Sequence, residues 1–253
     1  MFSLASRLGD PRRLAYALRN YAREKGLELG RSDPDRSLGL FLVTLFRHRG
    51  VNCVLDVGAH HGEYGTFLRR NGYKGYIISF EPVGTNFHVL ERLCGGDKRW
   101  FAHKIALGST SGTSTINVTS GTNFSSFQTP SAYGVREFDK DMAIDHTEQV
   151  RVERLDAIFT DLLAPITTPR VFLKVDAQGW DLEVLKGAAS NLDAITALQV
   201  EVSFRPVYEG APTFFETVPY LGQIGFDVTG IFTVYRDQQL RLGEVDCIMV
   251  HRS

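Results

Sequence analysis

The sequence is poor in the residues that build disulfide frameworks and metal clusters. It has three cysteines among 253 residues, Cys53, Cys94 and Cys247, which are too few and too widely spaced for a disulfide scaffold or a zinc site. Cys53 and Cys247 lie in apolar runs and are expected to be buried thiols, which fits a reducing compartment. The small disulfide-stapled class of secreted domain is therefore excluded.

Long apolar runs and an excess of charge of one sign are also missing. The longest apolar run, residues 38–46, is too short to span a bilayer, and the N-terminus lacks the apolar core of a signal peptide. The formal net charge is −1, so the overall charge gives no reason to expect nucleic acid as a partner. We expect a cytoplasmic protein with no transmembrane segment.

The most informative stretch that is present is a strand–glycine turn–helix signature at residues 54–65. A short apolar strand reaches Asp56, the turn Gly58-Ala59-His60-His61-Gly62 follows, and a helical pattern begins at residue 64. In doubly wound α/β domains such a turn offers backbone N–H groups to a nucleoside-bearing ligand. Nineteen residues after Gly62, a second strand ends in Glu81, whose carboxylate can accept hydrogen bonds from both ribose hydroxyls.

Two cofactor classes use this layout. Nicotinamide enzymes prefer G-x-G-x-x-G, whose middle glycine lets the backbone approach a pyrophosphate; here His60 takes that place and its imidazole would obstruct the pyrophosphate. S-adenosylmethionine has no pyrophosphate, and Asp56 could hold its ammonium group directly or through water. The pattern therefore favours S-adenosylmethionine over a nicotinamide. A turn that serves only helix–strand packing is the structural alternative.

The periodicity predicts one α/β domain over residues 51–253 behind a helical extension over residues 1–50. The fold class expected is doubly wound α/β, with a mostly parallel seven-stranded sheet that ends in an antiparallel hairpin, because no helical spacer separates the last two strands. A polar stretch at about 109–150 is predicted to be an insertion over the ligand cleft. Strands are predicted at 52–57, 75–80, 101–107, 114–118, 171–176, 197–202, 226–235 and 244–251, and the main helices at 11–29, 38–47, 63–71, 84–94 and 214–224.

The first 25 residues are locally basic, with five arginines and Lys25. A solvated helix face is the simpler interpretation, and an electrostatic contact with an acidic partner or a membrane surface is the sharper one. A helical pair in this segment would also suit the arm of a homodimer.

From about Val51 to Arg252 the residues resemble the FkbM-type methyltransferase family. The carriers are the glycine turn, Phe80-Glu81-Pro82 with Asn86, Ala106-Leu107-Gly108, the block from Phe172 to Ala188, Glu201 with Tyr208-Glu209-Gly210, and Val245-Asp246. The resemblance implies the class I methyltransferase fold, Rossmann-like, and O-methylation that depends on S-adenosylmethionine. It implies that Glu81 takes the ribose hydroxyls and that Ala106 and Leu107 flank the adenine. The expected cofactor-binding set is Asp56, Gly58, Ala59, His60, Gly62, Glu81, Pro82, Asn86, Ala106 and Leu107.

The chain departs from the family pattern at two positions. Gln178 and Asp181 stand where the family usually has glutamate. The first departure removes a charge beside the cleft and weakens a role for that position as a base or metal ligand.

The rim formed by the carboxyl ends of the strands is expected to carry the chemistry. Asp176 is the first candidate for a general base, against the alternative that it caps the next helix. Glu201 is the second catalytic candidate and could orient the acceptor or pair with Lys174. Asp156, Asp176 and Glu201 could offer oxygen ligands to Mg²⁺, but the sequence shows no tight ligand cluster, so a metal is not favoured. Tyr208 could stack on a sugar face, or belong to a packed turn.

The function predicted is an S-adenosylmethionine-dependent O-methyltransferase that acts on a hydroxyl of a sugar, glycan, glycolipid or glycosylated natural product. The partner is then a small-molecule or saccharide acceptor. A catalytically silent scaffold that binds S-adenosylmethionine is the first alternative, and a nicotinamide-dependent oxidoreductase is the second.

Overall fold

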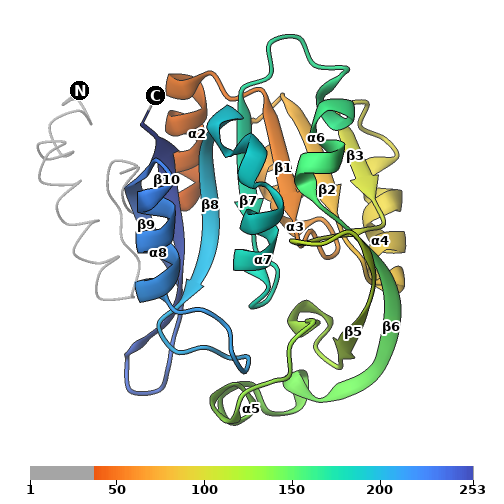
Figure 1. Cartoon of the computed structure of the whole chain (residues 1–253), viewed down its shortest axis with the longest axis vertical. Helices are drawn as coiled ribbons and strands as arrows, with labels where there is room; N and C mark the ends of the chain where they lie inside the picture. Colours follow the sequence, from red (N-terminus) through yellow and green to blue (C-terminus); the bar gives the residue numbers. More distant parts are fainter. Residues whose placement is uncertain (1–36, 253) are drawn as a thin grey trace, which may run out of the picture.

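The computed structural model describes residues 37–252 and is built around a seven-stranded sheet (Figure 1). The strands lie in the order β3-β2-β1-β7-β8-β10-β9. The first five pair in parallel, and β10 runs antiparallel to both of its neighbours. The bounds are β1 Cys53–Val57, β2 Tyr76–Phe80, β3 Trp100–His103, β7 Val171–Val175, β8 Ile195–Ser203, β9 Phe226–Arg236 and β10 Leu242–His251.

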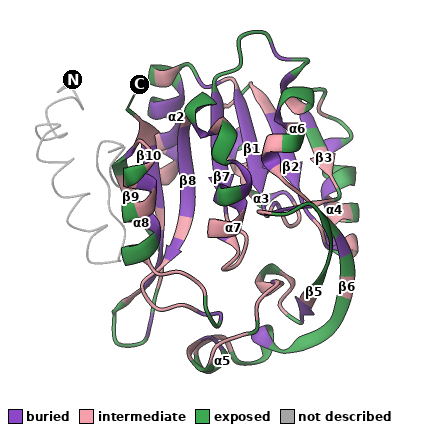
Figure 2. Cartoon of the chain, in the orientation of Figure 1, coloured by how far each residue is buried: buried purple, intermediate pink, exposed green. Residues whose placement is uncertain are grey.

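Helices cover both faces of this sheet. Apolar side chains of α2 (Leu38–Arg49), α3 (Glu63–Arg70) and α4 (Gly84–Cys94) pack in one cluster with Phe172 and Ile248 of the sheet. Those of α6 (Leu155–Leu163), α7 (Asp181–Gly187) and α8 (Phe214–Gln223) pack with Leu173 and Val245 on the other face. Because both faces are covered, every residue of β1 and β7 is buried (Figure 2). The predicted doubly wound fold is confirmed.

The predicted C-terminal hairpin is also confirmed. β9 and β10 pair antiparallel, and the carboxylate of Asp237 closes the turn between them by accepting the backbone N–H groups of Gln239 and Arg241. An aspartate that binds its own following backbone is a common way to fix a tight turn. Ahead of the hairpin, Thr213 and Glu216 form a reciprocal capping box that starts α8.

The strand predicted at 101–107 is wrong as a single element. It divides after His103, where the backbone N–H of Ile105 bonds back to the carbonyl of His103 and turns the chain. The first part, β3, closes the edge of the main sheet, whereas β4 (Ala106–Leu107) pairs in parallel with β6 of a second sheet. One continuous apolar run thus supplies two sheets, which an alternation pattern does not reveal.

The polar stretch after β4 folds into that second, three-stranded sheet, in the order β4-β6-β5. β5 (Gly112–Thr119) and β6 (Ile144–Glu153) pair antiparallel and extend away from the main sheet, beyond the ends of β1 and β7 (Figure 1). Between them lie η3 (Thr122–Phe124), α5 (Ala132–Phe138) and η4 (Asp139–Met142). The prediction missed β6, because six of its ten residues are exposed and its first four show no alternation. The remaining element is η5 (Ala189–Ala194).

The helix predicted at 11–29 and most of the proposed N-terminal extension lie outside the described residues. Within residues 37–252, no helix combines the length and the apolar character needed to cross a bilayer.

Candidate functional site

A cavity of about 240 Å³ lies at the carboxyl ends of β1, β2 and β7. The second sheet provides its far wall, through Ala106, Leu107 and Ile116, and the loop between β5 and α5 provides its roof, through Thr122, Asn123, Ser125 and Phe127. Ligands of open α/β sheets bind at this position. Of the predicted site residues, Gly58, His60, Glu81, Pro82, Asn86, Ala106, Leu107, Asp176 and Glu201 line the cavity.

Gly58 forms the floor of the cavity and cannot be replaced by a larger residue without a clash. Its φ is +72°, and a Cβ built there would lie 1.8 Å from the carbonyl oxygen of Asp176. Only glycine allows the turn after β1 to lie so close to the turn after β7.

The glycine turn does not offer free N–H groups, in contrast to the expectation. The N–H groups of Gly58 and Ala59 donate to the carbonyl of Phe80, and that of Gly62 donates to Ala59. A Cβ on Gly62 would lie 2.7 Å from Leu93, so this glycine permits packing against α4. Ala59 and Gly62 are not among the cavity-lining residues, and the packing alternative describes them better than ligand binding.

Glu81 is held rigidly where β2 ends. One carboxylate oxygen accepts the N–H of His60 at 2.8 Å, and the other accepts the N–H of Val83 at 2.9 Å. Burial raises the pKa of Glu81 to about 7, against the lowering effect of these hydrogen bonds. A desolvated carboxylate with unused lone pairs is suited to accept hydrogen bonds from a polar ligand.

Asn86, in the first turn of α4, has an acceptor atom with no partner. Its Oδ1 is buried and makes no hydrogen bond, while its Nδ2 lies 3.5 Å from Glu81. A buried acceptor without a donor is costly, so a ligand that donates a hydrogen bond here would remove that cost. Asn86 and Glu81 together fit the predicted nucleoside-binding end.

Asp56 does not reach the cavity, and the expectation that it holds the cofactor's ammonium group is corrected. Its side chain is fully buried; it accepts a hydrogen bond from Ser79 at 3.0 Å and pairs with Lys174 at 3.3 Å. Asp56 therefore anchors a buried lysine beneath the floor of the cavity.

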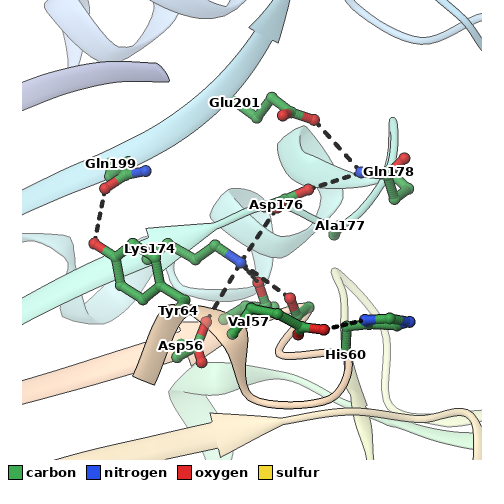
Figure 3. Close-up of polar contacts among 12 residues, drawn as sticks. Asp56, Val57, His60, Tyr64, Lys174, Asp176, Ala177, Gln178, Gln199 and Glu201 are labelled. Carbon is green, nitrogen blue, oxygen red and sulfur yellow. Dashed lines mark hydrogen bonds and ion pairs between the residues drawn. The ribbon is translucent and has the colours of Figure 1, made fainter. Parts of the chain in front are cut away.

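Lys174 links the cofactor turn to the predicted catalytic rim (Figure 3). Its Nζ donates to the carbonyls of Val57 and Gly58 and lies 3.3 Å from a carboxylate oxygen of Asp176. Burial alone would lower the pKa of Lys174, but Asp176 and Asp56 outweigh it and raise the pKa above its usual value. One expectation was that Lys174 pairs with Glu201. Lys174 pairs with Asp56 and Asp176 instead.

Asp176 is not the cap of the following helix. The backbone N–H groups of Ala177 and Gly179 donate to the carboxylate of Asp181 instead. Asp176 accepts a hydrogen bond from the side-chain amide of Gln178 at 2.8 Å, and its side chain keeps 31% of its surface exposed. Its carboxylate is therefore available at the cavity wall.

Glu201 lies opposite Asp176 at the end of β8, 3.4 Å from the same Gln178 amide nitrogen. Burial raises the pKa of Glu201 well above its ordinary value, and the charges of Asp176, Glu244 and Asp246 add to the effect. Glu201 therefore keeps its proton to a higher pH than an ordinary glutamate. No lysine or arginine is among the residues that line the cavity in the described part of the chain.

Tyr208 belongs to a packed turn and does not line the cavity, so it is not placed to stack on a ligand. It is 2% exposed, and its hydroxyl contacts the carbonyl of Phe124 at 2.9 Å and the Oε1 of Gln178 at 2.8 Å. Ser126 adds a hydrogen bond to the carbonyl of Gln178 at 2.6 Å. These bonds tie the roof to the turn after β7.

The oxygen ligands proposed for Mg²⁺ do not all meet. Asp156 lies on α6, where it contacts Arg154 and Ser190. Within residues 37–252, His60, His61 and Glu63 form a group whose ligand atoms lie within 4.8 Å of one another. The carboxylate of Glu63 accepts a hydrogen bond from the backbone N–H of His61 and lies 3.0 Å from the Nδ1 of His60. These two contacts account for the position of Glu63 without an ion.

Several cavity residues were not identified from the sequence. The polar insertion was expected to lie over the cleft, but no individual residue in it was predicted to line the cavity. Those that do are Thr122, Asn123, Ser125 and Phe127. Trp180 packs against Phe127 with ring centroids 5.1 Å apart. The sequence TNFSSF, two aromatics among small polar residues, was the available signal.

Solved structures that are similar to this chain share little sequence with it. Fibrillarin from Aeropyrum pernix, with natively bound S-adenosyl-L-methionine, is 11% identical, with 94% of this chain and 74% of that chain covered and a TM-score of 0.41. A human methyltransferase 10 domain containing protein is 11% identical over 96% and 99% of the two chains, with a TM-score of 0.44. A putative S-adenosylmethionine dependent methyltransferase from Listeria monocytogenes is 8% identical over 84% and 100%, with a TM-score of 0.45.

No curated protein sequence matches the chain significantly. The methyltransferase FkbM domain matches residues 56–228, which is more than half of the 253 residues and contains the glycine turn, Glu81, Asp176 and Glu201. The main sheet, with five parallel strands and helices on both faces, is Rossmann-like. The chain belongs to the FkbM methyltransferase family.

Proposed function

We propose that this protein is an S-adenosylmethionine-dependent O-methyltransferase whose acceptor is a hydroxyl of a sugar, glycan, glycolipid or glycosylated natural product. The observation that carries the proposal is that side chains able to accept hydrogen bonds lie at both ends of one cavity. Glu81 and Asn86 lie at one end, and Asp176 and Glu201 lie at the other.

The cofactor end suits a nucleoside with a free diol. The Glu81 carboxylate can accept from the two ribose hydroxyls, and the unpaired Oδ1 of Asn86 can accept from the base. Ala106 and Leu107 are buried and apolar beside them, which suits an adenine face. S-adenosylmethionine, when bound, supplies a methyl group on an already activated sulfonium.

The acceptor end then needs to position a hydroxyl and take its proton. The hydroxyl oxygen forms a bond to the methyl carbon as the sulfur–carbon bond breaks, and the hydroxyl proton passes to a carboxylate. Asp176 is the group we assign to accept the proton, because its carboxylate lines the cavity and its side chain is 31% exposed. Glu201, with its raised pKa, orients the acceptor.

The lining of the cavity supports an uncharged acceptor. No lysine or arginine is among the lining residues, so a phosphate or carboxylate on the acceptor would find no cationic side chain to pair with there. Burial raises the pKa of both Glu81 and Glu201, which favours their neutral forms. A neutral polyol can form hydrogen bonds with these carboxyl groups in either form.

A direct experiment is to measure S-adenosylhomocysteine binding by calorimetry and then product formation with a panel of neutral sugars and glycosides. Micromolar binding together with transfer of one methyl group supports the proposal. Binding without transfer to any acceptor would favour the silent scaffold. Affinity for NAD(H) instead would favour the oxidoreductase, although the N–H groups of Gly58 and Ala59 are already bonded to Phe80 and are not offered to a pyrophosphate.

The cytoplasmic location, the homodimer and the peripheral membrane contact are also proposals. The last two depend on the basic N-terminal segment, which lies outside the described residues. Sedimentation with anionic vesicles, and light scattering of the full chain, test them separately from the chemistry.

A further inference from the structure

The side chain of Gln178 lies between the two carboxylates of the acceptor end (Figure 3). Its Nε2 donates to Asp176 at 2.8 Å and lies 3.4 Å from an oxygen of Glu201. Asp176 follows β7 and Glu201 is in β8, so one amide group bridges two neighbouring strands of the sheet.

The orientation of the amide is set by the carboxylate of Asp176, which can only accept the hydrogen bond. On the other side, the single hydroxyl hydrogen of Tyr208 is shared between the Oε1 of Gln178 at 2.8 Å and the carbonyl of Phe124 at 2.9 Å. A flipped amide would direct its oxygen at the oxygen of Asp176, which would leave two acceptors facing each other. The backbone is also held, since the carbonyl of Gln178 accepts from Ser126 and its φ is +52°.

The position of the amide matters because the carboxylates around it repel one another. Burial and the charges of Asp176, Glu244 and Asp246 raise the pKa of Glu201. Carboxylates that lie this close either keep a proton or are held by a cation. Lys174 reaches one oxygen of Asp176, but the side of Asp176 that faces Glu201 is occupied by the N–H groups of Gln178.

We propose that Gln178 is a positioning residue that takes the place of a divalent cation, holding Asp176 and Glu201 together for the acceptor hydroxyl. A cation at this point would meet the positive ends of the amide N–H bonds. The methyltransferase reaction of this protein therefore does not require a metal at the acceptor end. The role of Gln178 in positioning the acceptor hydroxyl rests on the proposed function. The exclusion of a cation from the space between Asp176 and Glu201 does not.

The substitution Gln178→Glu converts the bridge into a third carboxylate of nearly the same shape. It keeps an oxygen for Tyr208 and creates three hard oxygen ligands, the kind that Mn²⁺ and Mg²⁺ prefer. The matched control is Gln149→Glu, which makes the same chemical change on the exposed strand β6.

The first test is calorimetric titration of Mn²⁺ into the full-length protein saturated with S-adenosylhomocysteine. Gln178→Glu should bind Mn²⁺ at least roughly tenfold more tightly than the unchanged protein, and Gln149→Glu should not. If the unchanged protein binds Mn²⁺ as tightly as Gln178→Glu, the proposal is overturned. S-adenosylhomocysteine affinity, measured beforehand, should stay within about twofold in all three proteins, because Gln178 does not contact Glu81 or Asn86.

The second test uses turnover once an acceptor is identified. Chelation by EDTA should leave the unchanged protein fully active, whereas Gln178→Glu should lose kcat and regain part of it with Mn²⁺. A metal-dependent unchanged protein, or a Gln178→Glu variant with full kcat under EDTA, would refute the positioning role. If Gln178→Glu does not fold, Gln178→Met removes the bridge without adding charge, and an unchanged kcat in that variant refutes the role equally. Failure to bind S-adenosylhomocysteine in the unchanged protein would instead overturn the proposed function.

Discussion

The raised pKa of Glu81 makes cofactor affinity depend on pH in a calculable way. The ribose hydroxyls donate to a carboxylate, so they favour its ionised form. The folded-state pKa is raised from 4.5 to about 7 by burial. As the pH falls through that value, the ligand must bind to a protein in which Glu81 is increasingly protonated. The affinity for S-adenosylhomocysteine should therefore be fully present above pH 7 and be lost below it.

The size of the effect follows from the protonated fraction. If only the ionised form binds, Kd increases by about tenfold between about pH 8 and pH 6 for a group that titrates near 7. The variant Glu81→Gln should bind more weakly at high pH by about 1.5–3 kcal/mol, the usual value of a hydrogen bond to a charged group. It should also lose the pH dependence, because it has no group to titrate.

The assay is calorimetric titration with S-adenosylhomocysteine at a series of pH values. The matched control is Glu148→Gln, since Glu148 also accepts a backbone N–H at the start of α4 but does not line the cavity. That variant should keep both the affinity and the pH dependence. A Kd of the unchanged protein that is flat between pH 6 and 8, or a Glu81→Gln variant that still titrates, would refute the reasoning.

Three further changes test the remaining parts of the site. Asp176→Asn should abolish turnover while S-adenosylhomocysteine binding stays within about twofold; full activity in single-turnover experiments would remove Asp176 as the base. Lys174→Met should cost about 3–5 kcal/mol in urea unfolding, because it leaves the buried carboxylate of Asp56 without its cation; a loss below about 1 kcal/mol would contradict the pairing. Gly58→Ala should prevent folding or abolish cofactor binding because of the clash with the carbonyl of Asp176, whereas Gly50→Ala, with a similar positive φ of 68° and open space around it, should lower the melting temperature by only a few degrees.

The parts of the fold that could be predicted are those with a strong period. β1, β7 and β8 are largely apolar runs in a sheet covered on both faces; Asp176 follows β7 directly, and Glu201 lies near the end of β8. That pattern, with Glu81 directly after β2, was sufficient to place Glu81, Asp176 and Glu201 along one rim of the sheet. β6 could not be predicted as a ten-residue strand, since its first four residues are all exposed and only its last part, around Val150 and Val152, alternates between buried and exposed.

The role of Asp56 could not be predicted for a different reason. Sequence position places it at the end of a strand beside the glycine turn, but it does not say which way the side chain points. The side chain lies beneath the turn, where Lys174 from a strand more than a hundred residues later reaches it. A pairing of such long range leaves no local signal, and the same holds for the bridge from Gln178 to Glu201.

The small sheet has one more consequence, for the order in which ligands bind. β4 places Ala106 and Leu107 at the nucleoside end, while the loop that follows β5 contacts the turn that carries Gln178, through the hydroxyl of Ser126. Both sets of side chains belong to the small sheet and its loop. A ligand that fixes the position of this sheet at one end of the cavity also fixes it at the other end. The two substrates should then strengthen each other's binding by the same factor, as thermodynamic linkage requires.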